Sequence, residues 1–219
     1  GAALVAAGGD HRFSLNDADI VGRAGGAVEA GRLLHSLSTG NTRGVRAPNG
    51  GGAAPDIATG HITLDATGSR LVGDVLMESG EADIALKGGS SLTGALIERN
   101  GGRVKSMTLD GASSWIVRGD SSLAALDNGG TVAFAAPKAP GDFKTLTVDN
   151  YTGKGVLVLH TRLGDDASPT DRLVINAGKA SGRGALRIVN AGGNGALTAQ
   201  GRRVVQTING GSTAPDAFT

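Results

Sequence analysis

Short runs of alternating apolar and polar residues dominate the chain. Residues 61–65 (His-Ile-Thr-Leu-Asp) and 82–86 (Ala-Asp-Ile-Ala-Leu) place an apolar side chain at every second position. Because successive side chains of a β-strand point to opposite faces, each run presents one small apolar face and one polar face. Glycines and other turn formers separate the runs. The pattern predicts an all-β protein made of many short strands.

These runs recur with a period in the low twenties. Residues 86–92 and 109–115 share the pattern Leu-x-Gly-x-Ser-Ser-apolar and begin 23 positions apart. Residues 64–71 are a looser copy, which aligns Leu64 with Leu86 and has one extra residue before its second apolar position. Such a period indicates a solenoid of stacked coils.

A second repeat and the lengths of the runs indicate which solenoid this is. Val-Gly-Asp-Val at 72–75 and Thr-Gly-Ala-Leu at 93–96 lie 21 positions apart. The Leu-x-x-Leu-x-Leu pattern of leucine-rich repeats is absent, and runs of three to five alternating residues cannot bury their apolar face alone. Stacking the coils buries that face, which predicts a parallel β-helix with Trp115 in the core position of Leu92 one coil earlier.

Two segments interrupt the repeats. Residues 38–60 contain two prolines and a run of glycines, and we expect a long loop there that leaves a coil. Residues 135–141 contain two more prolines and precede a different pattern. We therefore divide the chain into β-helix coils at 1–135 and a C-terminal capping segment at 142–219. Three Asn-Gly-Gly triplets are expected to form corners or hairpin turns; they lie at 100–102, 128–130 and 209–211.

Composition restricts the function. The chain has 219 residues, with 38 Gly, one Trp, one Tyr, four Phe and no Cys. Its 21 basic and 20 acidic residues nearly balance, so a nucleic-acid partner has little support. The absence of Cys is compatible with export through an oxidising periplasm. The chain starts without a signal sequence, and we expect it to be part of a longer protein.

The final third carries a family resemblance. Its most specific block is Leu-Gly-Asp-Asp at 163–166 followed by Thr-Asp-Arg-Leu-Val-Ile at 170–175, within matching blocks that run from Asp142 to Thr219. This series resembles the C-terminal junction of pertactin-type bacterial autotransporter passengers. The resemblance implies a right-handed, single-stranded parallel β-helix that the segment called the autochaperone region closes at its C-terminal end. It also implies a cell-surface or extracellular location in a Gram-negative bacterium and an outer-membrane β-barrel after the passenger in the full-length chain. The pair Arg202 and Arg203 departs from the usual small or apolar residues at that point and leaves the pairing of the last strand open.

Candidate chemistry is sparse. The tripeptide Arg118-Gly119-Asp120 matches the attachment motif that some integrins bind, although Gly-Asp is also ordinary turn chemistry. Asp165, Asp166 and Asp171 share one loop, where turn and capping roles are favoured over calcium. No catalytic signature is present, the histidines lack metal-ligand spacing, and we expect no catalytic, metal or cofactor site.

Three functional hypotheses follow. The first is a monomeric, non-enzymatic β-helical stalk of a virulence-associated adhesin, which nucleates passenger folding and contacts a host cell-surface or serum protein. The second is a pure scaffold and folding module, with function in a missing N-terminal part. The third is a carbohydrate-active β-helix enzyme, which lacks support because the position after the repeated Leu holds Asp65, Lys87 and Asp110 and no constant acidic ladder.

Overall fold

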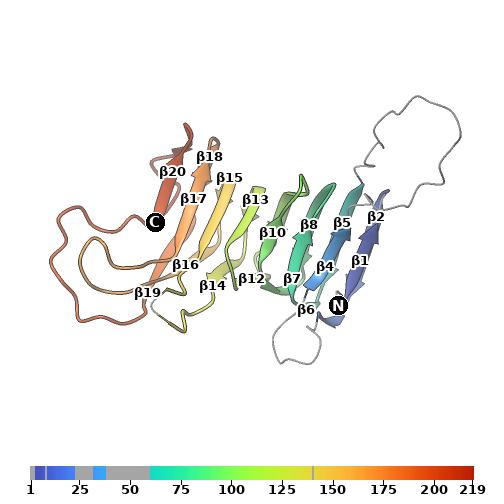
Figure 1. The fold of residues 1–219 in the computed structure, drawn as a ribbon, viewed down its shortest axis with the longest axis horizontal. Helices are drawn as coiled ribbons and strands as arrows, with labels where there is room; N and C mark the ends of the chain where they lie inside the picture. The colour runs from blue at the N-terminus through green and yellow to red at the C-terminus, as the bar shows by residue number, and fades with distance from the viewer. Residues whose placement is uncertain (1–2, 8, 23–31, 38–59, 140) are drawn as a thin grey trace, which may run out of the picture.

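The chain forms one elongated column of stacked strands. The computed structural model describes residues 3–7, 9–22, 32–37, 60–139 and 141–219, and it contains no α-helix in these ranges. Strands lie side by side along the long axis, with the N-terminus near one end and the C-terminus near the other (Figure 1). The predicted loop at 38–60 lies outside the described residues, apart from Gly60.

Three parallel sheets run along the column. Sheet A has the strand order β1 (Leu4–Ala7), β4 (Arg32–Leu37), β7 (Asp74–Met77) and β10 (Leu96–Glu98). Sheet C has the order β3 (Asp19–Val21), β6 (Arg70–Val72), β9 (Ser91–Gly94), β12 (Ser114–Val117), β14 (Thr131–Phe134), β16 (Val156–Thr161) and β19 (Ala185–Asn190).

Sheet B extends over the whole described length. Its main path is β2 (His11–Asn16), β5 (His61–Thr67), β8 (Glu81–Lys87), β11 (Arg103–Leu109), β13 (Ser121–Asn128), β15 (Thr145–Gly153), β17 (Arg172–Asn176) and β20 (Val205–Ile208). A side branch adds β18 (Lys179–Gly182), which pairs with β15, and β21 (Ser212–Thr213). Every described strand pair in the three sheets is parallel, so the predicted parallel β-helix is confirmed.

The core is a set of columns in which each inward side chain lies over its counterpart in the next coil. In sheet B the register gives the buried column Leu64, Ile84, Met107, Leu126, Tyr151 and Ala180. In sheet C, Leu92 lies over Leu71, and Trp115 lies over Leu92 as predicted. Because the apolar faces of single coils are small, burial becomes complete only through this stacking.

The register confirms two of the three repeats and corrects the third. Leu109 pairs with Leu86, and Val75 pairs with Leu96, as the repeats predicted. The alignment of Leu64 with Leu86 was wrong, because Leu64 pairs with Ile84 and Ala66 pairs with Leu86. The extra residue lies in the later coil as Gly89, at the turn between β8 and β9, where its φ of 81° suits glycine.

Asn-Gly-Gly triplets do not share one role. Asn100 and Asn209 adopt positive φ of 51° and 50°, as left-handed turn residues do. Asn128 instead ends β13 with a buried side chain, whose Nδ2 donates to Tyr151 Oη at 3.2 Å and to the Val156 carbonyl at 3.1 Å. The hairpin alternative was wrong at all three, because the two strands that flank each triplet do not pair with each other.

Candidate interaction surface

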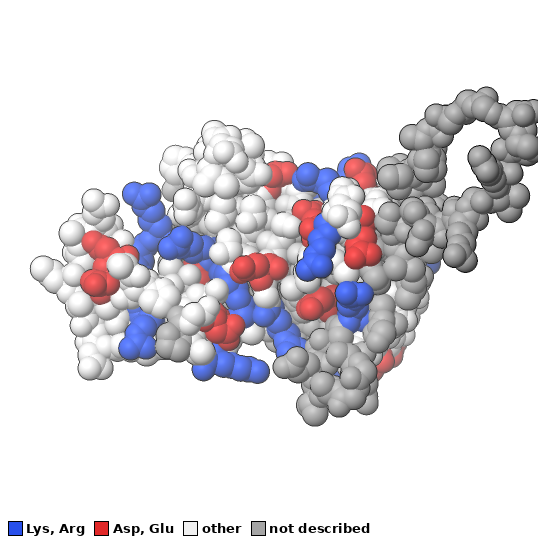
Figure 2. All heavy atoms as spheres, in the orientation of Figure 1, with Lys and Arg blue, Asp and Glu red and all other residues white. Residues whose placement is uncertain are grey.

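Charged side chains on the outer face of sheet B pair between successive coils. His61 Nε2 lies 2.9 Å from Asp83 Oδ2, and Lys105 Nζ lies 3.1 Å from Glu81 Oε2. Arg103 reaches farther along the column, to Asp149 Oδ2 at 3.4 Å. On the face of the column that Figure 2 shows, basic and acidic side chains are interspersed, so that face has no large field of one sign.

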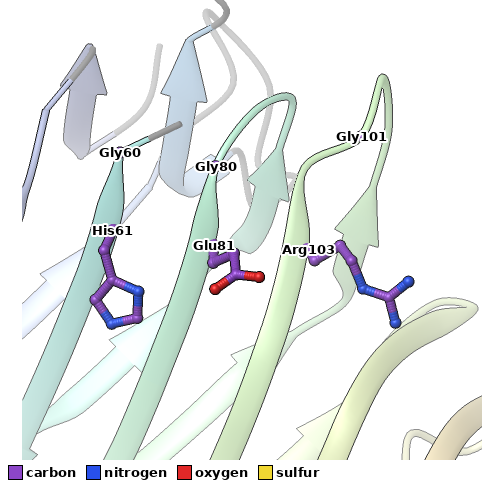
Figure 3. Close-up of a pocket in the computed structure, with 6 residues that line it drawn as sticks. All are labelled: Gly60, His61, Gly80, Glu81, Gly101 and Arg103. Atoms are coloured by element: carbon purple, nitrogen blue, oxygen red, sulfur yellow. The ribbon is translucent and has the colours of Figure 1, made fainter. Parts of the chain in front are cut away.

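A shallow hollow of about 360 Å³ lies where β5, β8 and β11 begin. His61, Glu81 and Arg103 occupy equivalent register positions and lie side by side along it (Figure 3). Gly60, Gly80 and Gly101 form its corner. Each of these three side chains already has a partner on another strand of sheet B, so the hollow leaves none of them unpaired.

Close backbone stacking requires glycine at this corner. A Cβ at Gly60 would lie 1.9 Å from the Gly9 carbonyl oxygen, and one at Gly80 would lie 2.2 Å from that of Gly60. This hollow was not predicted from the sequence. Its signal is the recurrence of glycine at 60, 80 and 101, which matches the period of the strands.

The predicted attachment tripeptide lies between β12 and β13. Arg118 and Asp120 are exposed and Gly119 is half-buried. Asp120 Oδ1 accepts the Thr145 N–H at 2.8 Å, which ties the tripeptide to the start of β15 in the next coil. The tripeptide is therefore a corner whose carboxylate also stabilises the stack.

Aspartates of the 163–171 loop each hold a different part of the chain. Asp166 accepts the N–H groups of Ala199 and Gln200 at 2.9 and 3.1 Å, together with that of Gly201. These hydrogen bonds, led by the one from Ala199, lower the pKa of Asp166 below its usual value. In return the Arg202 guanidinium donates to the carbonyls of Ser168 and Asp165. Arg202 therefore joins the loop that precedes β17 to the loop that precedes β20. The pairing of the last main strand is settled by the register, because β20 pairs with β17.

Asp171 is fully buried and joins three strands of the capping segment. Its Oδ1 accepts the Lys144 N–H just before β15, and its Oδ2 accepts the His160 N–H in β16, both at 2.8 Å. His160 Nδ1 lies 3.2 Å from the same Oδ2. Because β17 starts at the next residue, one carboxylate fixes the relative positions of β15, β16 and β17.

The end of the column is packed by aromatic side chains. Tyr151 and Phe218 stack with ring centroids 5.4 Å apart, and Tyr151 is fully buried. Burial raises the pKa of the Tyr151 phenol, and the hydrogen bond from Asn128 offsets this only partly.

The described residues contain neither a membrane-spanning helix nor a cluster of metal ligands. In those ranges no helix is long and apolar enough to cross a membrane. Nor do three or more His, Asp or Glu side chains come together there in a way that could hold a metal ion.

The comparisons with known proteins agree with this architecture. Residues 121–219 match the family model described as Autochaperone Domain Type 1, so the match begins before the predicted boundary at 142. The chain is 36% identical to the adhesin BmaC autotransporter of Brucella suis over 161 aligned positions, which cover 71% of the chain. It is also 36% identical over 91 residues (41% of the chain) to the BrkA autotransporter of Bordetella pertussis, and 33% identical over 134 residues (60% of the chain) to the pertactin autotransporter of Bordetella bronchiseptica.

These relatives are far longer than the matched region. The chain spans 4% of BmaC, 9% of BrkA and 14% of the pertactin autotransporter. Their names describe autotransporters and an adhesin, and none of the three is named for an enzymatic activity. The parallel β-helix, the family match and the relatives together identify the chain as a region of a pertactin-type autotransporter passenger, secreted to the surface of a Gram-negative bacterium.

Proposed function

We propose that the chain is the β-helical stalk of a non-enzymatic, adhesin-type passenger and that its C-terminal coils nucleate folding of the column. Asp171 carries this proposal. The groups that it joins lie within 142–171, so they come together by closing short loops. Once ordered, β15 and β16 offer parallel edges on which the preceding coils can form one at a time.

Refolding kinetics test the nucleation step. Asp171→Asn keeps an acceptor oxygen but loses the charge, and we expect it to slow refolding of the whole chain from urea. The matched control is Asp83→Asn in the exposed ladder of sheet B, which should leave the refolding rate nearly unchanged. An Asp171→Asn chain that refolds at the normal rate and only unfolds faster would contradict nucleation by these coils.

Contact with a host cell-surface or serum protein is the second part of the proposal. The relative BmaC is named as an adhesin, and the exposed loops and corners of the column are the surfaces available for such contact. Deleting residues 38–60 should reduce capture of the host protein, whereas a pure scaffold would be unaffected. Cell attachment that is unchanged by Asp120→Glu would remove the tripeptide from the contact.

In the full-length protein we propose that an outer-membrane β-barrel of the same chain is the partner of this monomeric stalk. The autotransporter relatives support this partner. The division into coils at 1–135 and a cap at 142–219 remains part of the proposal. A carbohydrate-active enzyme is the disfavoured alternative, and a polysaccharide cleavage screen would detect it.

A further inference from the structure

Four Asn-Gly pairs lie in the described part of the chain, and the fold gives them different surroundings. They are at 100–101, 128–129, 194–195 and 209–210. An asparagine before a glycine readily loses its side-chain amide, because glycine has no Cβ to keep its backbone nitrogen away from the side-chain carbonyl carbon. The surroundings therefore decide which of these pairs can react.

Loss of the amide needs two free groups. Hydroxide removes the proton from the glycine nitrogen, which then forms a bond to Cγ of the asparagine. The Cγ–Nδ2 bond breaks, Nδ2 leaves as ammonia with a proton from water, and a succinimide ring remains. Water opens this ring at either carbonyl and leaves aspartate or isoaspartate. A hydrogen bond that holds the glycine N–H or the side-chain amide opposes the first step.

Asn100 meets both requirements. Asn100 and Gly101 are exposed and form the centre of the turn between β10 and β11, beside the hollow (Figure 3). Among the described residues, no protein group bonds to the Asn100 side chain or to the Gly101 N–H. The turn closes one residue later, where the Gly102 N–H donates to the Arg99 carbonyl at 2.8 Å. Both reacting groups are therefore accessible to water.

Asn194 provides the same two free groups in another part of the molecule. It lies in the loop between β19 and β20, where Asn194 and Gly195 are both exposed. Neither the Asn194 side chain nor the Gly195 N–H has a protein partner within the described ranges. This pair is therefore as accessible as the pair at 100–101.

Asn128 is the contrast within the same chain. Its side chain is fully buried, and Nδ2 donates to Tyr151 Oη and to the Val156 carbonyl. The Gly129 N–H donates to the Leu109 carbonyl at 2.9 Å. Both reacting groups are therefore held by the fold, away from water.

We propose that Asn100 and Asn194 are sites of spontaneous deamidation in the folded, exported chain, whereas Asn128 keeps its amide. The reaction needs water and hydroxide and no enzyme. Each event replaces a neutral amide with a carboxylate, so the column accumulates acidic forms at its surface. The proposal does not depend on the proposed function, although it alters a surface that a host protein would meet.

The product at Asn100 changes the surface without unfolding the coil. β10 and β11, on either side of the turn, stay paired with β7 and β8. Isoaspartate adds a methylene to the main chain inside the turn, where space is open, since a Cβ at Gly101 would have no heavy atom within 4 Å. The new carboxylate lies beside the hollow, where the charges of Glu81 and Arg103 otherwise balance.

Peptide mapping of the intact chain tests the order of reaction. The purified chain is kept for days in mildly alkaline buffer, and mass spectrometry follows the change from amide to carboxylate at each pair. We expect Asn100 and Asn194 to react and Asn128 to remain unchanged. In urea, where the fold is lost, Asn128 should react as fast as Asn100.

Asn209 tests whether one hydrogen bond slows the reaction. It is exposed like Asn100, but its Nδ2 donates to Asn176 Oδ1 at 2.7 Å, so it should react more slowly than Asn100. Asn176→Ala removes this acceptor and should raise the rate at Asn209 several-fold, while the rate at Asn100 stays the same. Asn100→Gln, whose longer side chain closes a ring less readily, should abolish reaction at that turn and leave the rate at Asn194 unchanged.

Three outcomes would overturn the proposal. The first is an unchanged Asn100 in the folded chain under conditions in which the unfolded chain reacts, because the turn would then protect it. The second is reaction at Asn128 as fast as at Asn100 in the folded chain. The third is loss of the β-sheet circular dichroism in the deamidated fraction after anion exchange, because the change would then not be confined to the surface.

Discussion

Coils before Arg118 and coils after it hold the same stack together in different ways. The earlier coils have strands in all three sheets, and their outer charges pair on the surface, as Lys105 does with Glu81. The later coils lack sheet A and place polar groups inside, as with Asp171, Asn128 and Lys144. Lys144 is 5% exposed, and its ammonium donates to the carbonyls of Ala135 and Asp142.

The difference predicts which part of the column is more stable and more uniquely ordered. Exposed ion pairs contribute little because water and salt screen them. A buried carboxylate that accepts backbone N–H groups contributes more, since those donors would otherwise be buried without acceptors. The later coils are therefore expected to be the more stable and the more uniquely ordered part.

Trp115 links the two regions, because β12 pairs with β9 on one side and β14 on the other. Trp115→Ala should cost about 4 kcal/mol through the cavity that it leaves and should separate the unfolding of the two regions. Circular dichroism during urea titration would then show two transitions. Trp115→Leu, which introduces the same side chain that Leu92 has one coil earlier, should lose less stability. A single transition with little loss in Trp115→Ala would mean that β12 does not link the regions.

Asp171→Ala leaves the Lys144 and His160 N–H groups without their acceptor and should destabilise the later coils by about 3 kcal/mol. Hydrogen exchange of β15 and β16 measures the loss. Asp83→Ala in the exposed ladder is the matched control and should cost less than about 1 kcal/mol. Equal losses would remove the distinction between buried and exposed carboxylates.

Tyr151 makes the later coils sensitive to alkaline pH. Its folded-state pKa is raised by burial, so above pH about 10 the unfolded chain releases a proton that the folded chain keeps. The free energy of unfolding therefore falls as pH rises above this value. Because the chain has one tyrosine, phenolate absorption reports this group alone. The absorption should rise only as the column unfolds.

Tyr151→Phe supplies the matched comparison. It should remove this part of the alkaline loss and cost about 1 kcal/mol at neutral pH, through the lost hydrogen bond with Asn128. Free titration of the phenol near its usual pKa in the folded chain would contradict the buried placement.

Salt should have the smallest effect. Raising sodium chloride to about 1 M screens exposed pairs such as Glu81 with Lys105 and should lower the stability of the earlier coils by less than about 1 kcal/mol. Exchange of the β16 amides should hardly change. A loss of several kcal/mol in the earlier coils would mean that the surface pairs hold them together.

Sequence patterns predicted the stack well where a side chain faces the core. Period-2 runs and repeats with a constant spacing place Leu86 under Leu109 and Leu92 under Trp115, because both partners are apolar and the corner between them has constant length. The alignment of Leu64 failed because its corner differs in length: Gly89 adds one residue in the later coil, where glycine is already expected. Composition cannot locate an insertion of that kind.

The polar features of the later coils could not be predicted in this way. In the sequence, Asp171 cannot be distinguished from other aspartates in loops. Its role depends on the fold, which places the Lys144 and His160 N–H groups beside it. The end of sheet A depends on the three-residue connection between β12 and β13, and in the sequence alone these residues are only a tripeptide motif. Such features depend on which strands become neighbours, and local patterns do not contain that information.

Native-state hydrogen exchange of the intact chain in increasing urea compares the two regions most directly. The amides of Val148 and Leu157 should remain protected at urea concentrations at which those of Leu64 and Ile84 already exchange freely. Loss of protection in the reverse order, or in both regions together, would contradict a column whose later coils are the more stable part.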